Sequence, residues 1–533
     1  LRKLLKSPVF FLFFYCFLFY FYIACLISLK KTSLTFCNHN TMSQTKSQEL
    51  GFPTYMTFCA TVAAFSGFHV GWAIGVPNMP QQMITKCLGG DAGGALPPCL
   101  PMSDTTWGLT VSAYALGGIA GALISKYANA LYSRRTNIMA TCVFFIIGNL
   151  LSAVSVNVPM YSVGRAIVGI AAGMCGSSSA IYVAEVSTNR SRGALGSLFE
   201  MFLNFGILIA QVLGRYLSYD PVWRFLWGLS SILAAIQLLV MLFFTVECPR
   251  RLCASKEYDA AAASLQKLRA GADIEEEFAQ ILAARQREQD NAIPPMSFWD
   301  ILSCKDKHIL WRTIIVMVIQ AYNQAGGIGP MSVFSSTIFS SLFNGDTSLA
   351  SNLVMANGAV NTAATFISIA IVHKVGRKNL MISSLFGTTL ASILMVVGAH
   401  NTDKPGIIIA ASIIFLSTYS LGCGVIPWFI APELVPMHAL SSATALGGMS
   451  NWLMNFIFNY TWTYMDMNLG KNAFIVFVVI NFVGLLFMIF FMPETTGHDL
   501  DADDSKTVGK DQQAESGASS QSYEKKEVEY LEN

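Results

Sequence analysis

Twelve apolar runs of membrane-spanning length recur along the chain between residues 54 and 492. An α-helix needs about 20 mainly apolar residues to cross the hydrocarbon core of a bilayer. The runs form two groups of six, at 54–78, 105–127, 136–157, 160–184, 194–217 and 222–245, and at 309–342, 350–373, 379–399, 407–432, 440–465 and 471–492. This pattern predicts an all-α, multi-pass membrane protein with twelve transmembrane helices.

The composition argues against most other classes of protein. Of the 533 residues, 53% are hydrophobic and only 12% are charged, whereas an ordinary soluble domain carries about 25% charged residues. The net charge of +2 creates no field that would attract nucleic acid. The sequence has no G-x-x-x-x-G-K-[ST] phosphate loop, H-E-x-x-H motif or paired-cysteine metal motif. We therefore expect the lipid bilayer as a partner, with no nucleotide, cofactor or metal and no enzymatic activity.

The two ends of the chain differ from the rest. Residues 9–29 are apolar enough to span a membrane, and no methionine occurs before Met42. Three interpretations are open for this segment: an extra helix, a signal peptide, or upstream sequence translated before the true start. The missing methionine favours the last, so we treat 1–41 as a non-native extension. Residues 498–533 are rich in Asp, Ser, Gln, Lys and Glu, which predicts a disordered tail.

Between these ends, the sequence predicts three parts. Residues 42–245 and 309–497 are expected to form two six-helix bundles, and 246–308 a helical linker interrupted at Gly271 and at Pro294-Pro295. Lys and Arg are concentrated in the linker and in the even-numbered loops. By the positive-inside rule, the linker and both termini should be cytoplasmic if translation starts at Met42, and we expect the plasma membrane.

Three charged motifs occur once in each group of helices, at a nearly constant offset. They are Arg134-Arg135 and Gly376-Arg377-Lys378, Glu185 and Glu433, and Glu247-Cys248-Pro249-Arg250 and Pro493-Glu494-Thr495. Ordinary positive-inside anchoring explains the arginines but not the glutamates, because acidic residues contribute little to that rule. The repetition therefore predicts a duplicated six-helix unit.

Several short motifs follow one another in a characteristic order. They are Gly164-Arg165, Tyr182–Ser187, Arg192–Gly196, Gly206–Gln211, Val360-Asn361-Thr362, Ile426–Phe429, Ser450-Asn451-Trp452 with Asn455, and Pro493-Glu494-Thr495. In this order the sequence resembles the sugar porter family of the major facilitator superfamily, close to the animal facilitative glucose transporters. The resemblance implies two pseudo-symmetric bundles and a small sugar as partner, bound at mid-membrane between them.

The resemblance also implies the residues that would bind the sugar. They are Glu200, Gln320, Asn323, Gln324, Asn361, Trp428, Asn451 and Trp452. Buried amides also act as glue between membrane helices, and this alternative stays open. The spacing of three and four residues among Gln320, Asn323 and Gln324 favours a shared cavity.

The sequence departs from the family pattern at several of these positions. Asn323 stands where the family has the longer glutamine, and Gly329 stands where it has an asparagine. Ser420 replaces a glutamate or a similar polar residue. The resemblance therefore supports a sugar better than it supports glucose.

A second implied set is a cytoplasmic gate that would clip the two bundles together while the inside is closed. It comprises Arg134, Arg135, Arg165, Glu185, Arg192, Glu247, Arg250, Arg377, Lys378, Glu433 and Glu494. Glu185 and Arg192 match the family's E-x6-R pattern, and Arg165 lies one helix length from Glu185. In the second bundle this pattern is broken, because Leu440 stands where Arg is expected.

We predict facilitated diffusion of a hexose or a related polyol by alternating access. Proton-coupled relatives carry an aspartate where this chain has Ala73. Glu200 opens an alternative, because it stands where the family has a glutamine and a carboxylate in the membrane is functionally suspect. The other readings are an organic-acid transporter with proton linkage through Glu200, and a transporter-like nutrient sensor.

Cys87 and Cys99 share one polar loop that contains four glycines. This flexibility allows a disulfide between them, and two free thiols are an equal alternative. The cysteines in apolar runs are expected to be reduced packing residues.

Overall fold

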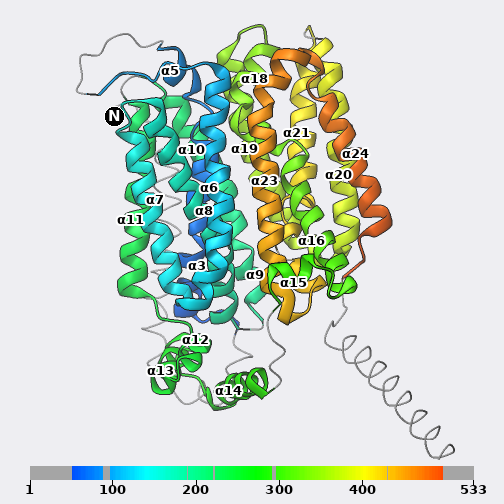
Figure 1. The fold of residues 1–533 in the computed structure, drawn as a ribbon. Coiled ribbons are helices and arrows are strands. Elements are labelled where there is room, and N and C mark those ends of the chain that lie inside the picture. Colours follow the sequence, from blue (N-terminus) through cyan, green and yellow to red (C-terminus); the bar gives the residue numbers. More distant parts are fainter. Residues whose placement is uncertain are drawn as a thin grey trace, which may run out of the picture.

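The computed structural model describes residues 51–87, 96–188, 190–219, 222–290, 296–401, 403–428 and 430–495. The expected extension 1–41 and the expected tail 498–533 lie outside these residues. Figure 1 shows two upright groups of helices side by side, with short helices beneath the first group. We call the end with these short helices the linker side, and the opposite end, where α5 (Gln81–Lys86) lies, the disulfide side.

The first group, called the first half below, contains the helices that precede the linker. They are α3 (Thr54–Ala64), α4 (Ser66–Gly75), α6 (Asp104–Leu131), α7 (Arg134–Ala153), α8 (Val158–Val186), α9 (Arg192–Gly196), α10 (Leu198–Leu217) and α11 (Trp223–Phe244). Polar side chains start several of them by accepting a hydrogen bond from a free backbone N–H. Ser103, Ser133 and Asn157 do this for α6, α7 and α8.

The second group, called the second half, follows the linker. It comprises α16 (Lys307–Ala325), α17 (Ile328–Val333), α18 (Ser335–Leu342), α19 (Thr347–Val375), α20 (Arg377–His400), α21 (Pro405–Leu421), η3 (Ile426–Trp428), α22 (Ala431–Leu434), α23 (Met437–Leu469), η4 (Gly470–Asn472) and α24 (Ile475–Phe491). Gly327 separates α16 from α17, with a φ of 105° that glycine adopts without strain. The linker forms α12 (Pro249–Ala254), α13 (Tyr258–Leu268), α14 (Glu275–Asp290) and α15 (Phe298–Leu302).

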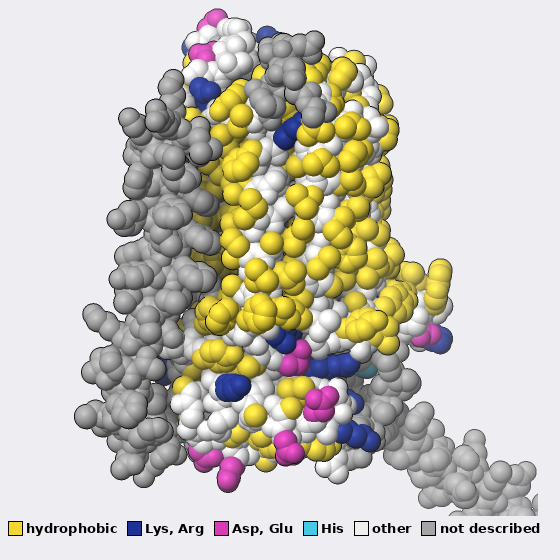
Figure 2. Space-filling view, turned by 90° about the vertical axis from the view of Figure 1, so that its left-hand side faces the viewer, with side chains coloured by type: hydrophobic (Ala, Val, Ile, Leu, Met, Phe, Trp, Pro, Cys, Tyr) yellow, Lys and Arg dark blue, Asp and Glu magenta, His cyan; other side chains and the backbone are white. Residues whose placement is uncertain are grey.

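These helices match the predicted spans in order. Among the described residues, eight spans are long and apolar enough to cross a membrane alone, and α23 with α24, which meet at a 99° bend, qualify together. Figure 2 shows apolar side chains over the length of the bundle and charged ones mainly at the linker side. Phe243 and Phe490 expose 71% and 73% of their surface, which suits contact with lipid. The expected all-α fold of two six-helix bundles is confirmed.

Helices within the first half touch through their backbones. Gly67, Gly71 and Gly206 lie between α4 and α10, and a methyl group added at Gly71 would lie 1.8 Å from the carbonyl oxygen of Leu203. Gly169 makes the same approach between α8 and α6, 1.9 Å from the carbonyl oxygen of Tyr114. Small residues allow such close packing in membranes, where helix association depends on van der Waals contact.

Contact between the halves is made through side chains. We call this boundary, where α6 packs on α23 and α10 packs on α19, the seam. At Gly118 the nearest atoms across the seam belong to the ring of Trp452, and at Gly358 to Gln211 and Leu208. Side chains can rearrange where backbones cannot, so the halves are less rigidly fixed to each other along the seam than the helices are inside the first half.

The disulfide side is held by covalent and polar contacts. The structure joins Cys87 and Cys99, with their Cα atoms 5.2 Å apart. The Asn78 amide donates to Ser332 O and to Ser335 Oγ, both at 2.8 Å, and its Oδ1 accepts from the Ser336 N–H at 3.0 Å. These bonds tie the halves together at this end.

Candidate functional site

Four of the predicted sugar-binding amides meet in one network inside the second half. Asn451 Nδ2 donates to Gln320 Oε1 at 3.1 Å and to Asn323 Oδ1 at 2.9 Å, and Gln324 Nε2 donates to Asn323 Oδ1 at 2.7 Å. Asn455, on α23, extends the network by donating to Gln324 Oε1 at 2.8 Å. Asn451 lies 14 residues into α23, or about 20 Å along its axis, so the network is near the middle of the bundle.

The network also supports a break in the neighbouring helix. Between α21 and η3 the backbone is not helical, which frees carbonyl groups from their usual partners. Gln320 Nε2 donates to Pro427 O and Asn323 Nδ2 to Cys423 O, both at 2.7 Å. These amides therefore stabilise the break, as the alternative of glue between helices expects.

Glu200 and Asn361 meet through a residue that the sequence analysis did not select. Asn204, one turn beyond Glu200 on α10, donates to Glu200 Oε1 at 3.2 Å and to Thr365 Oγ1 at 3.1 Å. Asn361 Nδ2, on α19, donates to Asn204 Oδ1 at 2.7 Å. Ser420 Oγ in turn donates to Asn361 Oδ1. This chain of polar groups crosses the seam.

Two buried acceptors on the same face of α10 have no hydrogen-bond partner among the described residues. They are Glu200 Oε2 and Gln211 Oε1. Glu200, Asn204 and Gln211 are separated by four and seven residues and so share a helix face. This polar spacing in an otherwise apolar helix is the signal that would have identified Asn204 and Gln211. Buried acceptors normally have partners, so these two atoms mark places where a ligand hydroxyl or a water can donate.

The two tryptophans of the predicted site face the first half. The Trp452 ring packs edge-on against Tyr114, with 5.3 Å between centroids, and the Trp428 ring lies 6.2 Å from that of Phe199. Trp428 remains 39% exposed. The predicted sugar-binding residues therefore form two polar clusters and two aromatic contacts. The first cluster bonds to Cys423 O and Pro427 O at the break, and the second bonds to Ser420 in the last turn of α21.

The duplicated charges at the linker side form two matching arrangements. In the first half, Glu185 pairs with Arg134 at 3.7 Å and accepts from Cys248 Sγ at 2.8 Å. In the second half, Glu433 pairs with Arg377 at 2.9 Å and accepts from Thr495 Oγ1 at 2.5 Å. Glu247 and Glu494 also correspond, since each accepts a hydrogen bond from the backbone N–H of the next residue.

These ion pairs do not bridge the halves, contrary to the expected clip. Glu185 ends α8 and Arg134 begins α7, two neighbouring helices of the first half, so the nearest cation belongs to its own half. Arg377 and Glu433 both lie in the second half, where the backbone N–H groups of Arg377 and Lys378 donate to Glu494. In this conformation the duplicated charges fasten helix ends within each half.

Arg165 was assigned to the wrong end of the molecule. It lies seven residues into α8, counted from the disulfide side, so about 30 Å of helix separates it from Glu185. Its guanidinium is buried, donates to Ala73 O at 2.7 Å and lies 4.9 Å from the centroid of the Tyr114 ring. The structure places Arg165 within the core of the first half, and it shows no ion pair with Glu200 among the described contacts.

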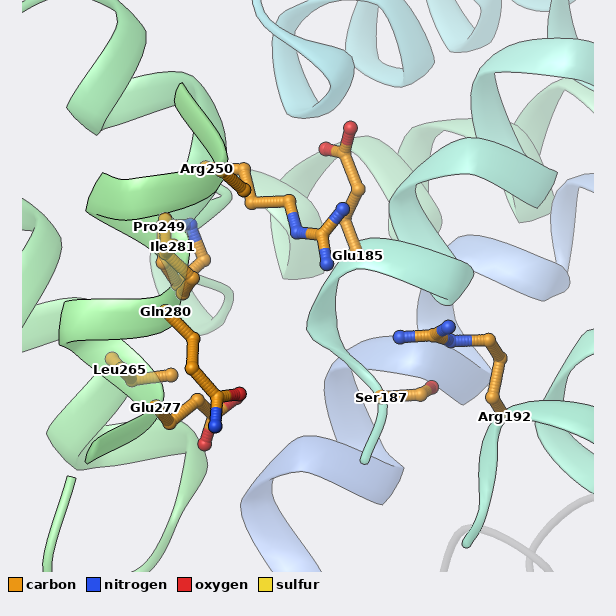
Figure 3. A pocket seen from close by; sticks show the side chains of 10 residues that line it. Glu185, Ser187, Arg192, Pro249, Arg250, Leu265, Glu277, Gln280 and Ile281 are labelled. Carbon is orange, nitrogen blue, oxygen red and sulfur yellow. The ribbon is translucent and has the colours of Figure 1, made fainter. Parts of the chain in front are cut away.

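The remaining gate residues lie around the linker. Arg135 donates to Met241 O and Leu242 O and so anchors the end of α11. Arg192 and Arg250 line a cavity of about 230 Å³ between the end of α8 and α14. Figure 3 shows Arg192 extending into this space from the side opposite Glu277 and Gln280, and Arg250 extending toward Glu185. Glu277 is held by Arg269, with 2.6 Å between Oε1 and Nη2.

Cys248 and Cys304 should differ sharply in reactivity. Burial raises the pKa of the Cys248 thiol well above its usual value, and the nearby charge of Glu185 raises it further. Cys304 is exposed. Because the thiolate is the nucleophile, a maleimide at neutral pH should alkylate Cys304 in the folded protein and Cys248 only after denaturation. Peptide mapping checks this, and rapid labelling of native Cys248 would contradict the buried contact with Glu185.

The comparisons with known proteins agree with this architecture. Residues 59–505 match the family model described as "Sugar (and other) transporter". The rabbit (Oryctolagus cuniculus) solute carrier family 2, facilitated glucose transporter member 3 is 30% identical over 456 residues, covering 83% of this chain and 90% of the relative. The mouse (Mus musculus) member 4 is 29% identical over 455 residues, covering 82% and 88%.

Solved structures support the same fold. The xylose transporter XylE from E. coli, in a partially occluded inward-open conformation, aligns with a TM-score of 0.67 at 20% identity, covering 83% of this chain and all of that one. XylE bound to 6-bromo-6-deoxy-D-glucose aligns with a TM-score of 0.65. These relatives are integral membrane transporters, in line with the prediction that this chain is not an enzyme. The chain belongs to the family of sugar (and other) transporters.

Proposed function

We propose that the protein is a uniporter that moves a hexose or a related polyol down its gradient by alternating access. The linker side faces the cytoplasm, and the membrane is the plasma membrane. The observation that carries this proposal is the polar chain across the seam at mid-bundle, built mainly from amides and hydroxyls. A sugar hydroxyl both donates and accepts, and so does an amide, whereas a charged substrate would call for a fixed counter-charge.

The unpartnered acceptors support the same assignment. Glu200 Oε2 and Gln211 Oε1 face the other half without a donor among the described residues, and sugar hydroxyls supply donors. The names of the relatives also favour a sugar, since the rabbit and mouse proteins are facilitated glucose transporters. The position where proton-coupled relatives carry an aspartate is Ala73, whose carbonyl accepts from Arg165.

Proton-linked transport through Glu200 is the second candidate, favoured by the buried carboxylate oxygen without a donor. One solved relative is named a proton:xylose symporter. If Glu200 takes up a proton during transport, Glu200→Gln should remove any dependence of uptake on pH while sugar binding survives, because the amide keeps the shape of the carboxyl group.

Uptake into liposomes that contain the purified protein tests both candidates. We expect radiolabelled hexoses or polyols to equilibrate without accumulating, at rates that an imposed proton gradient does not change, for both the native protein and Glu200→Gln. Accumulation driven by the proton gradient and lost in Glu200→Gln would replace uniport by symport. Transport of organic acids alone would refute the sugar assignment.

A further inference from the structure

Lys126 of the first half reaches across the seam at the linker side. Lys126 lies on α6, five residues before its end. Its Nζ donates to Ser442 Oγ, at the start of α23, at 2.8 Å and lies 3.7 Å from the centroid of the Phe298 ring on α15. The ammonium group therefore sits in a site made by a hydroxyl and an aromatic face, a favourable arrangement for a cation.

Both partners of Lys126 are fixed to the second half. The Met296 N–H, just before α15, donates to His438 O at 3.0 Å, and Ser442 Oγ donates to Met296 O at 2.6 Å. Ile301 of α15 is fully buried in the core of the second half. Phe298 and Ser442 should therefore move with α23.

The other part of the linker is fixed to the first half. Arg269, between α13 and α14, donates to Val186 O at the end of α8 at 2.8 Å, and Leu268 is fully buried in a core cluster with residues of α3, α7 and α8. The linker is thus divided between the halves. Lys126 is a charged side chain of the first half that contacts the portion held by the second.

The surrounding packing leaves little freedom for this contact. α6 and α23 run antiparallel along the seam, with Gly118 against Trp452 and Ala122 near Gly448, 3.8 Å from a methyl group placed there. Lys126 is one turn beyond Ala122 toward the linker side. When the halves separate at this end, the lysine must leave both of its partners.

We propose that Lys126 is the latch that holds the linker side closed, the role expected of the duplicated charges. Its partner surface is α15, through Phe298. This inference rests on the proposed alternating access. Losing the latch favours the conformation open at the linker side, because it removes an attraction present only in the closed one. Lys126 does not touch the substrate and acts as a positioning residue.

Thiol labelling of the full-length protein tests the latch without needing a substrate. The reporter is Gly176→Cys, since Gly176 lies on α8 and faces Trp428 across the seam. The background carries Cys304→Ser, which removes the exposed free thiol of the described residues, and peptide mapping reads the labelling at residue 176 itself. Labelling is done from the linker side with a membrane-impermeant maleimide. Lys126→Met, which keeps the chain length, should raise the labelling rate about three- to tenfold, the range expected for losing a cation–π contact and a hydrogen bond.

Three further variants separate the latch from a merely structural role. Lys126→Arg keeps the charge and should restore slow labelling, whereas Phe298→Leu should raise the rate and add little to Lys126→Met. Lys305→Met is the matched control, because Lys305 pairs with Asp300 on its own segment and should leave the rate unchanged. Native labelling rates in both Lys126→Met and Phe298→Leu would overturn the latch. The proposed function fails separately, if no sugar is transported.

Discussion

Replacing Gly71 with alanine should destabilise the first half severely, because the added methyl group would lie 1.8 Å from the carbonyl oxygen of Leu203. Backbone atoms on both sides form this contact, so neither helix can relieve the clash by changing a rotamer. Overpacking in a tight core costs about 1–3 kcal/mol and sometimes more, and we expect the upper end of this range or beyond. The measurement is the fraction of monodisperse protein that survives heating in detergent, followed by size-exclusion chromatography.

Gly228→Ala is the matched control on another membrane helix. No heavy atom lies within 4 Å of the methyl group that this substitution adds, and alanine is the better helix former by about 1 kcal/mol. Gly228→Ala should therefore match or exceed the native protein in stability. If Gly71→Ala survives heating as well as Gly228→Ala does, α4 and α10 are not packed as closely as described.

Replacing Gln320 with alanine should lower sugar uptake about 10- to 100-fold, as expected when buried hydrogen bonds are lost and their partners are left unsatisfied. Gln320 holds Asn451 with its carbonyl oxygen and Pro427 O with its amide group. Its loss disturbs both the amide network and the break beside η3. Initial rates over a range of sugar concentrations, normalised to the amount of protein at the cell surface, measure the effect.

Gln237 provides a control for the glue reading. It is also a buried glutamine, and its Nε2 donates to a backbone carbonyl, Val62 O, at 2.8 Å, but it lies inside the first half, away from the seam. Gln237→Ala should lower the free energy of unfolding and leave the KM for sugar near the native value, whereas Gln320→Ala should raise the KM. Equal effects of the two substitutions on KM would mean that Gln320 only stabilises the bundle.

The helices were predictable because long apolar runs have one stable solution in a bilayer. The duplicated unit was predictable too, since its charges recur in order, and the structure adds that Cys248 and Thr495 make equivalent bonds to Glu185 and Glu433. The break between α21 and η3 lies beside Gly422 and Gly424, where a helix can bend, but residues 407–432 were predicted as one span. A hydropathy average cannot show which amides will satisfy the freed carbonyls.

The misplaced residues have specific physical causes. Arg165 was grouped with Glu185 by motif, although its position near the start of α8 already puts it about 30 Å away. Whether an ion pair lies within one half or bridges the two depends on which helices are neighbours. A single sequence does not give that information. The sequence analysis did not select Lys126, because a lysine near the end of a membrane helix is common. The proposed role follows only from its partners Ser442 and Phe298.

The contrast between backbone contact inside the first half and side-chain contact along the seam has a consequence for how such a protein can change. If the seam binds the solute as proposed, substitutions there should alter which solute fits while the packing inside each half is kept. Substitutions at the helix crossings should instead destabilise the fold first. Substrate selectivity and fold stability should thus depend on different residues. On the proposed function, a directed library confined to positions such as Asn204, Gln211 and Asn361 should shift selectivity at a smaller cost in folded yield than one at Gly71 or Gly169.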